Sequence, residues 1–306
     1  MNSTLAAVLS LAAAAHATTE RPIIAIATHP SASTNGDCGG DCELVEASYV
    51  KWIEAAGARA VPLGYSWTDA QVDALLGQVN GVLFPGGGST YPPSAARAVN
   101  VSLTLAEAGE TLPVWGTCLG FEWINQIIGG ITLTGSYDSE NYSIPLDFVD
   151  ADAAVGSRML GGLDSEVGSS DGICGGTSGS PFVSQRSATV PYRRARFAQV
   201  RDALGAENIT MNNHGYGVAP ATFAASAALS GFFDVLSTNL DRKGKEFVST
   251  IEASDDKYAV FGTQWHPEKC QFEWGLSPDG TPYEAHSHSP HAVAASQHLA
   301  NVSERA

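Results

Sequence analysis

Short apolar runs alternate with segments of helical periodicity through the first half of the chain. The apolar runs span three to six residues, as buried strands do, and Gly, Pro or Asn residues punctuate the chain around them. In the intervening segments apolar residues recur every three or four positions, the spacing of one helix face. The predicted strands are 22–27, 59–63, 81–84 and 113–115, and the predicted helices are 44–56, 69–76, 94–108 and 121–128.

This alternation predicts an α/β fold of three layers, αβα, in which helices cover both faces of a doubly wound, mostly parallel sheet. The second half is richer in strands, at 131–150 and 233–262, and we expect these to be antiparallel extensions of the sheet. A final helix is predicted at 290–301. We expect a single domain over 18–306, with the Gly- and Ser-rich segment 163–189 as an insertion.

The strongest chemical signal follows the predicted strand at 113–115. Gly116-Thr117-Cys118-Leu119-Gly120 has the Gly-x-nucleophile-x-Gly form of a nucleophile elbow, with cysteine as the nucleophile. The two glycines permit a sharp turn, and the following helix N-terminus favours the reactive thiolate. The alternative is a buried structural cysteine at a strand end.

A second predicted strand, 258–265, leads into His266-Pro267-Glu268. A thiol nucleophile needs a base, and the base needs a group that orients it. His266 and Glu268 are two residues apart, so on an extended strand end their side chains would point the same way. We therefore predict a triad in which Cys118 is the nucleophile, His266 the base and Glu268 the orienting carboxylate.

Glycines follow the strand at 81–84 and predict an oxyanion hole. Gly86 and Gly87 allow the backbone to approach a reacting group and to present N–H donors to it. With the N–H of Leu119, one of them would stabilise the oxyanion of an acyl-transfer reaction. A phosphate-binding loop is the competing interpretation, but no Gly-Lys-Ser/Thr sequence follows.

Three segments resemble the gamma-glutamyl hydrolase family: 84–87, 116–122 and 264–269. Similar stretches follow in family order over about residues 21–300, with a poor match near 164–200. The family removes gamma-linked glutamates from folate polyglutamates and has the class I glutamine amidotransferase-like fold. The resemblance implies a cysteine hydrolase that acts through a thioester, needs no cofactor and forms a homodimer.

The resemblance implies one further substrate contact, and helix geometry suggests another. His214 sits where the family has a substrate-contacting histidine, although the preceding Met211-Asn212-Asn213 differs from the family pattern. Glu122, four residues after Cys118, is expected on the same side of its helix and at the pocket. Two other functions stay open: a glutaminase-type amidase of this fold, and a catalytically silent binding protein.

Charge restricts the partners of the chain. Its 306 residues carry a net charge of −16, which argues against nucleic acid and anionic membrane surfaces as partners. A polyglutamate is also anionic, so its capture needs a local cluster of donors. Lys269 and Arg59 are candidates for that cluster.

Cysteine and histidine spacing gives no clear metal site. Cys38 and Cys42 form a close pair, but no second close pair completes a zinc site, so we expect a local disulfide or loop thiols. Cys174 and Cys270 have no assigned role. The histidines near the C-terminus are His286, His288, His291 and His298. Ser287-His288-Ser289-Pro290 resembles a segment of the same family, which implies a structural or pocket-edge role, without metal, for these histidines.

The N-terminal residues resemble a secretory leader. The apolar run from Leu5 to Ala15 is too short to span a bilayer, and Ala15-His16-Ala17 fits a signal-peptide cleavage site, although no basic residue precedes the run. We therefore predict a signal peptide at 1–17 and a vacuolar, lysosomal or extracellular location. A disordered Ala-rich leader is the alternative. Four sequons agree with the secretory route, at Asn100, Asn141, Asn208 and Asn301.

Overall fold

The computed structural model describes residues 21–30, 42–150, 154, 156–160 and 200–305. The predicted signal peptide, the Gly- and Ser-rich segment 163–189, Cys38 and Cys174 lie outside these residues. No helix within the described ranges is long and apolar enough to cross a membrane.

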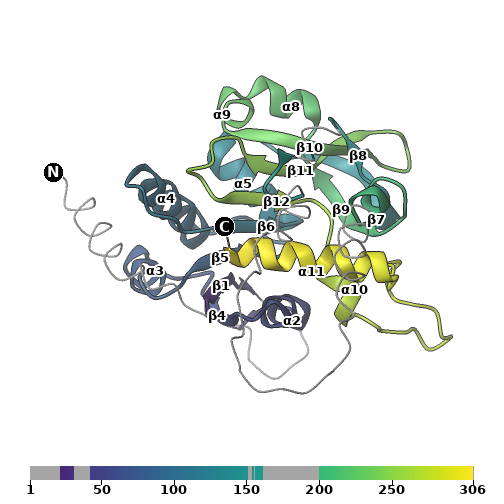
Figure 1. The fold of residues 1–306 in the computed structure, drawn as a ribbon, viewed down its shortest axis with the longest axis horizontal. Coiled ribbons are helices and arrows are strands. Elements are labelled where there is room, and N and C mark those ends of the chain that lie inside the picture. Colours follow the sequence, from purple (N-terminus) through teal and green to yellow (C-terminus); the bar gives the residue numbers. More distant parts are fainter. Residues whose placement is uncertain (1–20, 31–41, 151–153, 155, 161–199, 306) are drawn as a thin grey trace, which may run out of the picture.

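An eight-stranded sheet forms the centre of the molecule (Figure 1), with strand order β4-β1-β5-β6-β12-β11-β10-β8. The first five strands in this order are mutually parallel, and the last three continue the sheet with antiparallel pairing. The strands of this sheet are β1 (Ile23–Ala27), β4 (Arg59–Leu63), β5 (Gly81–Phe84), β6 (Val114–Thr117), β8 (Asp147–Phe148), β10 (Phe233–Leu240), β11 (Glu246–Ala253) and β12 (Val260–Thr263).

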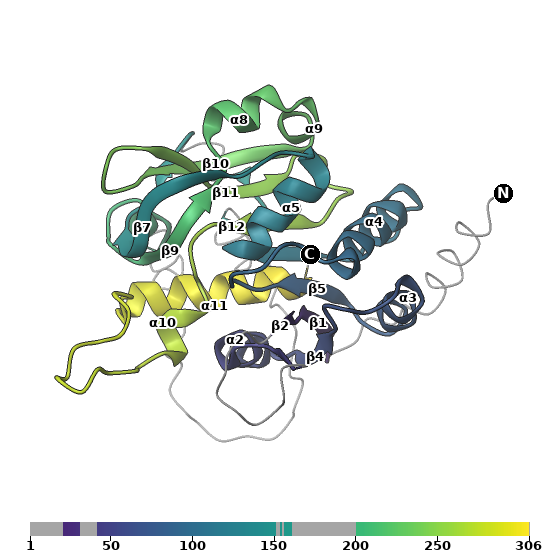
Figure 2. The same cartoon turned by 180° about the vertical axis from the view of Figure 1, so that it is seen from behind.

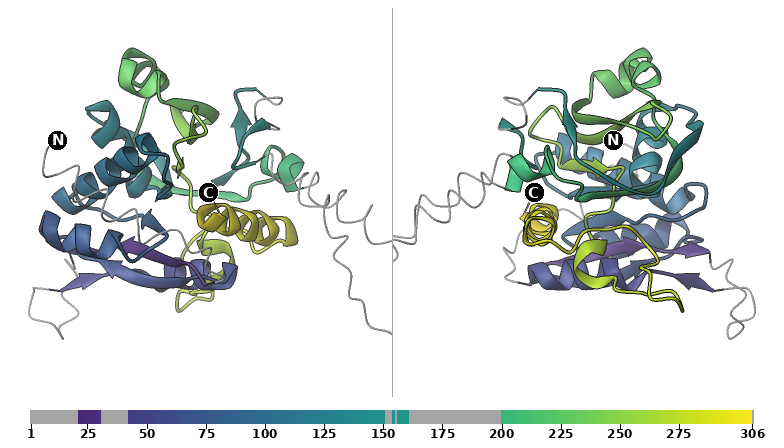
Figure 3. Two further views of the ribbon diagram at one scale, coloured as in Figure 1. Left: turned by 60° about the vertical axis from the view of Figure 1, so that its left-hand side comes forward. Right: turned by 90° about the vertical axis from the view of Figure 1, so that its right-hand side faces the viewer.

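Helices cover both faces of the sheet, as Figure 3 shows from two sides. One apolar core joins one face to α3 (Asp69–Leu76), α4 (Pro93–Glu107), α5 (Leu119–Gly129), α8 (Pro220–Ala225) and α9 (Ala227–Ser230). A second core joins the other face to α2 (Ala47–Ala56), α10 (Lys269–Phe272) and α11 (Pro290–Arg305). The three-layer, mostly parallel arrangement predicted from the sequence is thus confirmed.

The prediction for 131–150 was partly wrong. Strand β7 (Thr134–Ile144) does not extend the main sheet; it pairs antiparallel with β9 (Thr210–Gly217) as a separate two-stranded sheet (Figure 2). Only β8 joins the main sheet. A further small sheet pairs β2 (His29–Pro30) with β3 (Glu43–Leu44). Strand β9 escaped prediction because its polar and glycine residues lack apolar alternation, and its pairing with β7 specifies it instead.

The sheet order brings the three predicted motifs to one edge. Strand β6 lies between β5 and β12, and all three run parallel. Their carboxyl ends therefore coincide, and these ends lead into Gly86 and Gly87, Cys118, and His266. Binding sites of open α/β sheets occur at this edge.

Candidate active site

Cys118 occupies a strained turn between β6 and α5. Its backbone has φ of 52° and ψ of −105°, a region that residues with a side chain seldom adopt. A Cβ on Gly116 would lie 2.6 Å from the carbonyl carbon of Gly120, and one on Gly120 would lie 2.0 Å from the Phe84 oxygen. The elbow glycines are therefore required by close backbone packing, and α5 begins immediately after the sulfur-bearing residue.

His266 contacts Glu268, but not by the predicted geometry. Strand β12 ends at Thr263, and Glu268 has helical backbone angles, so the two side chains do not share an extended strand end. The turn through Pro267 still brings His266 Nδ1 to 2.7 Å from Glu268 Oε1. Burial lowers the pKa of His266, but the charges of Glu268 and of the Cys118 thiolate outweigh it and raise this pKa to about 10.

Cys118 and His266 line the same cavity of about 300 Å³. A Cβ added to Gly86 would lie 2.7 Å from His266 Cε1 and 3.4 Å from Cys118 Cβ. The Gly86 backbone therefore lies close to both side chains. His266 Nε2 is buried and has no hydrogen-bond partner among the described residues, so this nitrogen is free for proton exchange.

The N–H of Gly86 is already occupied. It donates to the Tyr49 hydroxyl over 2.7 Å, and the same hydroxyl lies 3.4 Å from His266 Nδ1. Within the described part of the chain, the N–H groups of Gly87 and Leu119 donate to no other group. Gly87 packs against His29, whose ring atoms would lie 2.8–3.1 Å from a Cβ at this position. Gly87 and Leu119, rather than Gly86, therefore retain the donors that an oxyanion needs.

Glu122 and His214 are buried and are not among the residues that line the cavity, so neither has the pocket position predicted from the sequence. Glu122 accepts a hydrogen bond from Gln264 over 3.2 Å, and burial raises its pKa to about 7. His214 Nδ1 lies 2.7 Å from the main-chain carbonyl oxygen of Tyr216. The centroids of the His214 and Phe247 rings are 4.7 Å apart. Burial lowers the pKa of His214 to about 4, so its ring is neutral at ordinary pH.

Tyr49 and Glu284 line the cavity, and sequence reasoning proposed neither as a site residue. Lys269, which the sequence suggested as a substrate donor, also lines the cavity and contacts both Glu273 and Glu284. Asn213 has its carbonyl oxygen 4.0 Å from Cys118 Sγ. Their positions depend on helix α2, strand β9 and the loop after α10 meeting at the sheet edge, which local patterns do not report. The cavity lining is Glu46, Ser48, Tyr49, Gly86, Gly87, Cys118, Asn213, His266, Lys269, Glu273 and Glu284.

Arg59 and Cys270 lie outside the cavity. Arg59 begins β4, at the amino edge of the parallel strands, and donates to the Arg21 carbonyl, so it cannot serve as the local substrate donor considered above. Cys270 Sγ lies 3.4 Å from the main-chain carbonyl oxygen of Ala292, and burial raises the pKa of the Cys270 thiol to about 11. Cys42 is disulfide-bonded.

The C-terminal histidines make contacts of several kinds. The rings of His286 and His288 pack edge to face with 4.8 Å between their centroids, and His286 also lies against the Glu273 carbonyl and Glu284. His288 lies against the Cys270 carbonyl and the Trp274 ring, His291 against Glu207, and His298 against the Met159 carbonyl. No group of three or more potential metal ligands occurs in the described ranges. Three of the sequon asparagines, Asn100, Asn141 and Asn208, are exposed, and the fourth, Asn301, is half-buried.

This chain is similar to several known proteins. Residues 45–278 match the family Glutamine amidotransferase class-I. Gamma-glutamyl hydrolase B of Dictyostelium discoideum is 33% identical over 287 residues, covering 92% of this chain and 70% of that protein. Gamma-glutamyl hydrolase of Mus musculus is 33% identical over 290 residues, covering 92% of this chain and 76% of that protein. The solved structure of the Trypanosoma brucei CTPS glutaminase domain with bound acivicin aligns with 91% of this chain and 94% of its own chain, at 13% identity and a TM-score of 0.48.

Proposed function

Since this chain belongs to the gamma-glutamyl hydrolase family of class I glutamine amidotransferases, we propose that it hydrolyses gamma-glutamyl amide bonds with Cys118 as its nucleophile. The observation that carries this proposal is that Cys118, His266 and Gly87 line one cavity, while the buried Glu268 holds His266 and Leu119, next to Cys118 in the chain, has an unused N–H. Acyl transfer requires this combination of nucleophile, oriented base and oxyanion donors.

In the first half of the reaction, His266 Nε2 accepts the proton of the Cys118 thiol, Sγ attacks the gamma-carbonyl carbon, and the carbonyl electron pair moves to oxygen. The N–H groups of Gly87 and Leu119 stabilise the resulting oxyanion, at about 2.7–4 kcal/mol per donor in a typical enzyme of this type. His266 Nε2 then donates its proton to the amine nitrogen as the C–N bond breaks. A thioester on Cys118 and a free amine result.

In the second half, water attacks the thioester carbonyl while His266 Nε2 accepts its proton. The C–S bond breaks, the gamma-carboxylate leaves, and Cys118 is regenerated. Glu268 keeps the imidazole in place through its 2.7 Å contact with Nδ1 and stabilises the imidazolium that each half passes through.

The substrate class we propose is folate polyglutamate. A cavity of about 300 Å³ is at the lower end of small-molecule sites, so it accommodates one glutamyl group while the rest of the substrate lies outside. The same cavity would also accept the side chain of free glutamine, whose amide has the same chemistry. A glutaminase activity is therefore the second candidate.

The test is hydrolysis of pteroyl-polyglutamate and of free glutamine by the purified protein and by two variants. Cys118→Ala should abolish turnover, whereas Cys270→Ala, which removes a buried thiol outside the cavity, should retain it. Ammonia release from glutamine with intact polyglutamate would assign the glutaminase reaction instead. Full polyglutamate hydrolysis by Cys118→Ala would refute the proposed nucleophile.

A secretory route is a separate part of the proposal. It is supported by the leader-like sequence at 1–17 and by exposed sequons at Asn100, Asn141 and Asn208. Mass spectrometry of the native protein should find a mature N-terminus near residue 18 and N-linked glycan at these asparagines. An intact Met1 and unmodified sequons would contradict it.

A further inference from the structure

The wall of the cavity is predominantly acidic. Among the lining residues that the structure describes there are three glutamates, Glu46, Glu273 and Glu284, and one lysine, Lys269. The ammonium of Lys269 lies 3.0 Å from Glu273 Oε2 and 2.8 Å from Glu284 Oε2, so it is shared between two of the three carboxylates. The wall therefore carries more negative than positive charge.

Glu46 is the carboxylate of this wall that has no cation of its own. It makes no ion pair with any described residue, and as the N-cap residue of α2 it forms no capping hydrogen bond through its side chain. Loss of hydration at the cavity wall and the charge of Glu268 raise the pKa of Glu46, and the charges of Lys269 and His266 do not cancel this shift. A cation supplied by a ligand would therefore stabilise the Glu46 carboxylate.

Helix α2 places Glu46 beside the reacting groups. Glu46 and Tyr49 are three residues apart at the start of α2, so their side chains lie on the same side of this turn. The Tyr49 hydroxyl lies 3.4 Å from His266 Nδ1, and both residues line the cavity with Cys118. His266 is 6% exposed, and its Nε2 has no hydrogen-bond partner among the described residues. This buried nitrogen indicates a ligand site independently of the acidic wall.

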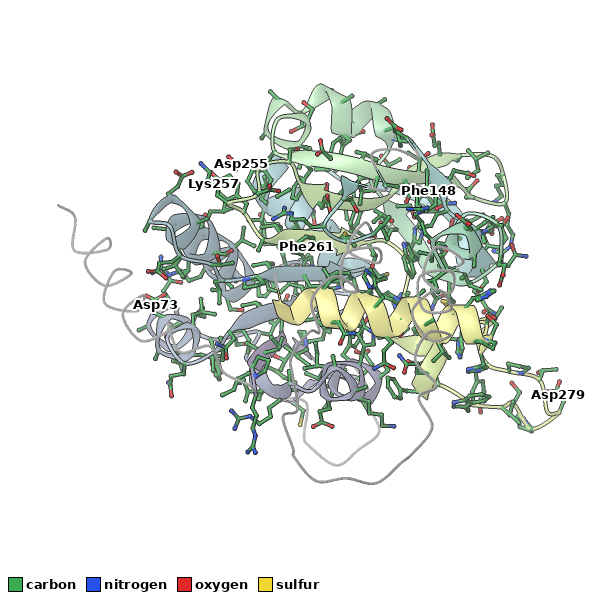
Figure 4. All side chains as sticks on the ribbon, viewed as in Figure 1. Asp73, Phe148, Asp255, Lys257, Phe261 and Asp279 are labelled. Carbon is green, nitrogen blue, oxygen red and sulfur yellow. The ribbon has the colours of Figure 1, made fainter. Side chains whose placement is uncertain are left out.

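The other two carboxylates flank one loop. Glu273 directly follows α10, Glu284 precedes α11, and the loop between them extends to Asp279 at its far end (Figure 4). The N–H of Tyr283 donates to the Gly275 carbonyl over 3.0 Å and closes the base of this loop. The closed base holds both glutamates at the cavity, so the acidic charge of the wall is fixed by the fold.

Gamma-glutamyl donors differ in the group on their α-nitrogen. In folate polyglutamate this nitrogen is acylated and neutral, so the α-carboxylate makes the glutamyl group an anion. In a gamma-glutamyl dipeptide the α-nitrogen of the glutamyl group is an ammonium, and the group has no net charge. Only two methylene groups separate the gamma-carbonyl carbon from the α-carbon, so with the gamma-carbonyl at Cys118 the α-nitrogen lies in the same small cavity. An acidic wall attracts this ammonium and repels the acylated anion.

On the basis of the proposed Cys118 reaction, we infer that the cavity also takes gamma-glutamyl amides with a free α-ammonium, such as gamma-glutamyl dipeptides, and that Glu46 binds this ammonium. Hydrolysis follows the two halves described above. The amide C–N bond breaks, water supplies the new carboxylate oxygen, and glutamate and the free amine are released. Glu46 thus determines specificity for the α-nitrogen, and the protein has a second class of substrate besides polyglutamate.

The test compares gamma-glutamyl 4-nitroanilide, which has the free ammonium, with its N-acetyl derivative, in which the same nitrogen is neutral. The two compounds share the leaving group and the α-carboxylate. The parent should hydrolyse the free-amine compound with a kcat/KM at least ~10-fold higher. Glu46→Gln should raise KM for this compound by about threefold to tenfold, the scale of one partly exposed ion pair. It should not raise KM for the N-acetyl compound and should change kcat little.

Glu46→Asp keeps the charge and should retain the preference for the free amine, so it separates loss of charge from a disturbed helix. Glu54→Gln, an exposed change further along α2 and outside the cavity, is the matched control and should change neither KM.

An equal or lower parental kcat/KM for the free-amine compound would overturn the inference. An unchanged KM in Glu46→Gln, or an equal change for both compounds, would also overturn it. Pteroyl-polyglutamate, assayed in parallel, separates this inference from the proposed function. Cys118-dependent hydrolysis of polyglutamate without a preference for the free amine overturns the inference alone, and absence of any Cys118-dependent turnover overturns both.

Discussion

At the residue scale, burial sets the protonation of two ionisable side chains, Glu122 and His214, that do not line the cavity. Glu122 is 4% exposed and accepts one hydrogen bond, from Gln264, and burial raises its pKa to about 7. His214 is equally enclosed, and burial lowers its pKa to about 4. Near neutral pH the first is partly protonated and the second is neutral, so these two side chains bury little net charge.

A stability measurement over pH checks the environment of Glu122. Its folded pKa is higher than the value in an unfolded chain, so its contribution to stability is fully present below about pH 4.5. That contribution is lost as the pH rises through about 7. Glu122→Gln, which carries no charge at any pH, should match the parent near pH 4. At pH 8 it should exceed the parent by up to about 3 kcal/mol in unfolding free energy.

Urea denaturation at the two pH values measures this difference. Glu54→Gln, an exposed change on α2, is the control and should alter stability little at either pH. Equal effects of Glu122→Gln at pH 4 and pH 8 would mean that the carboxylate is not held in a site that disfavours its charge.

At the scale of elements, the elbow depends on how closely α5 approaches β5 and β6. Gly120 donates its N–H to the Pro85 carbonyl over 3.0 Å, and its Cα lies against the Phe84 carbonyl. This contact fixes the start of α5, and with it the position of the Leu119 N–H and of the Cys118 sulfur. The geometry of the reacting groups is thus set by strand-to-helix packing and not by the cysteine alone.

Gly120→Ala should therefore disrupt both stability and activity. The added methyl group would overlap the Phe84 oxygen, and relief requires α5 to move away from β5. We expect a loss of about 2–4 kcal/mol in stability, in the range of overpacked or strained core sites, and a fall in kcat of ~100-fold or more from misplacement of the nucleophile. Thermal melting and steady-state kinetics measure the two effects.

Gly88→Ala is the matched control, since a Cβ there meets no atom within 4 Å and the residue lies in the neighbouring glycine run. It should leave both the melting temperature and kcat near parental values. A Gly120→Ala protein with parental kcat would show that the close approach of α5 to β5 is not needed for the reaction.

At the scale of the whole molecule, the net charge of −16 opposes the capture of polyanionic substrates. The acidic cavity wall adds a local repulsion of the same sign. Screening by salt weakens both, because the Debye length falls from ~30 Å at 0.01 M to ~8 Å at 0.15 M ionic strength. The field of this protein therefore slows encounter with its proposed substrate.

The expected consequence is that kcat/KM for pteroyl-polyglutamate rises severalfold, about threefold to tenfold, between 0.01 M and 0.15 M salt. A gamma-glutamyl substrate without net charge, assayed under the same conditions, should show little change. Steady-state kinetics across ionic strength measures both. A decrease for the polyglutamate would mean that a basic surface guides it to the cavity.

The sequence alone predicted a large part of the element order and the site chemistry, because both have local signals. The predicted ranges 59–63, 69–76 and 81–84 coincide with β4, α3 and β5 residue for residue. Apolar periodicity and glycine punctuation are local properties, and the elbow around Cys118 is a local requirement for small residues on both sides of the nucleophile. Such features need no knowledge of distant contacts.

Tertiary structure alone decided which groups meet at the cavity. Tyr49 removes the Gly86 N–H from the set of oxyanion donors, and Glu284 reaches Lys269 across a loop. The departure of β7 from the main sheet toward β9 likewise places Asn213 beside Cys118. In each case the partners are far apart in the chain or carry no periodic pattern, and packing energy over the whole molecule fixes their contact. Residue patterns therefore determined the chemistry of this protein, and long-range packing determined the geometry in which that chemistry is arranged.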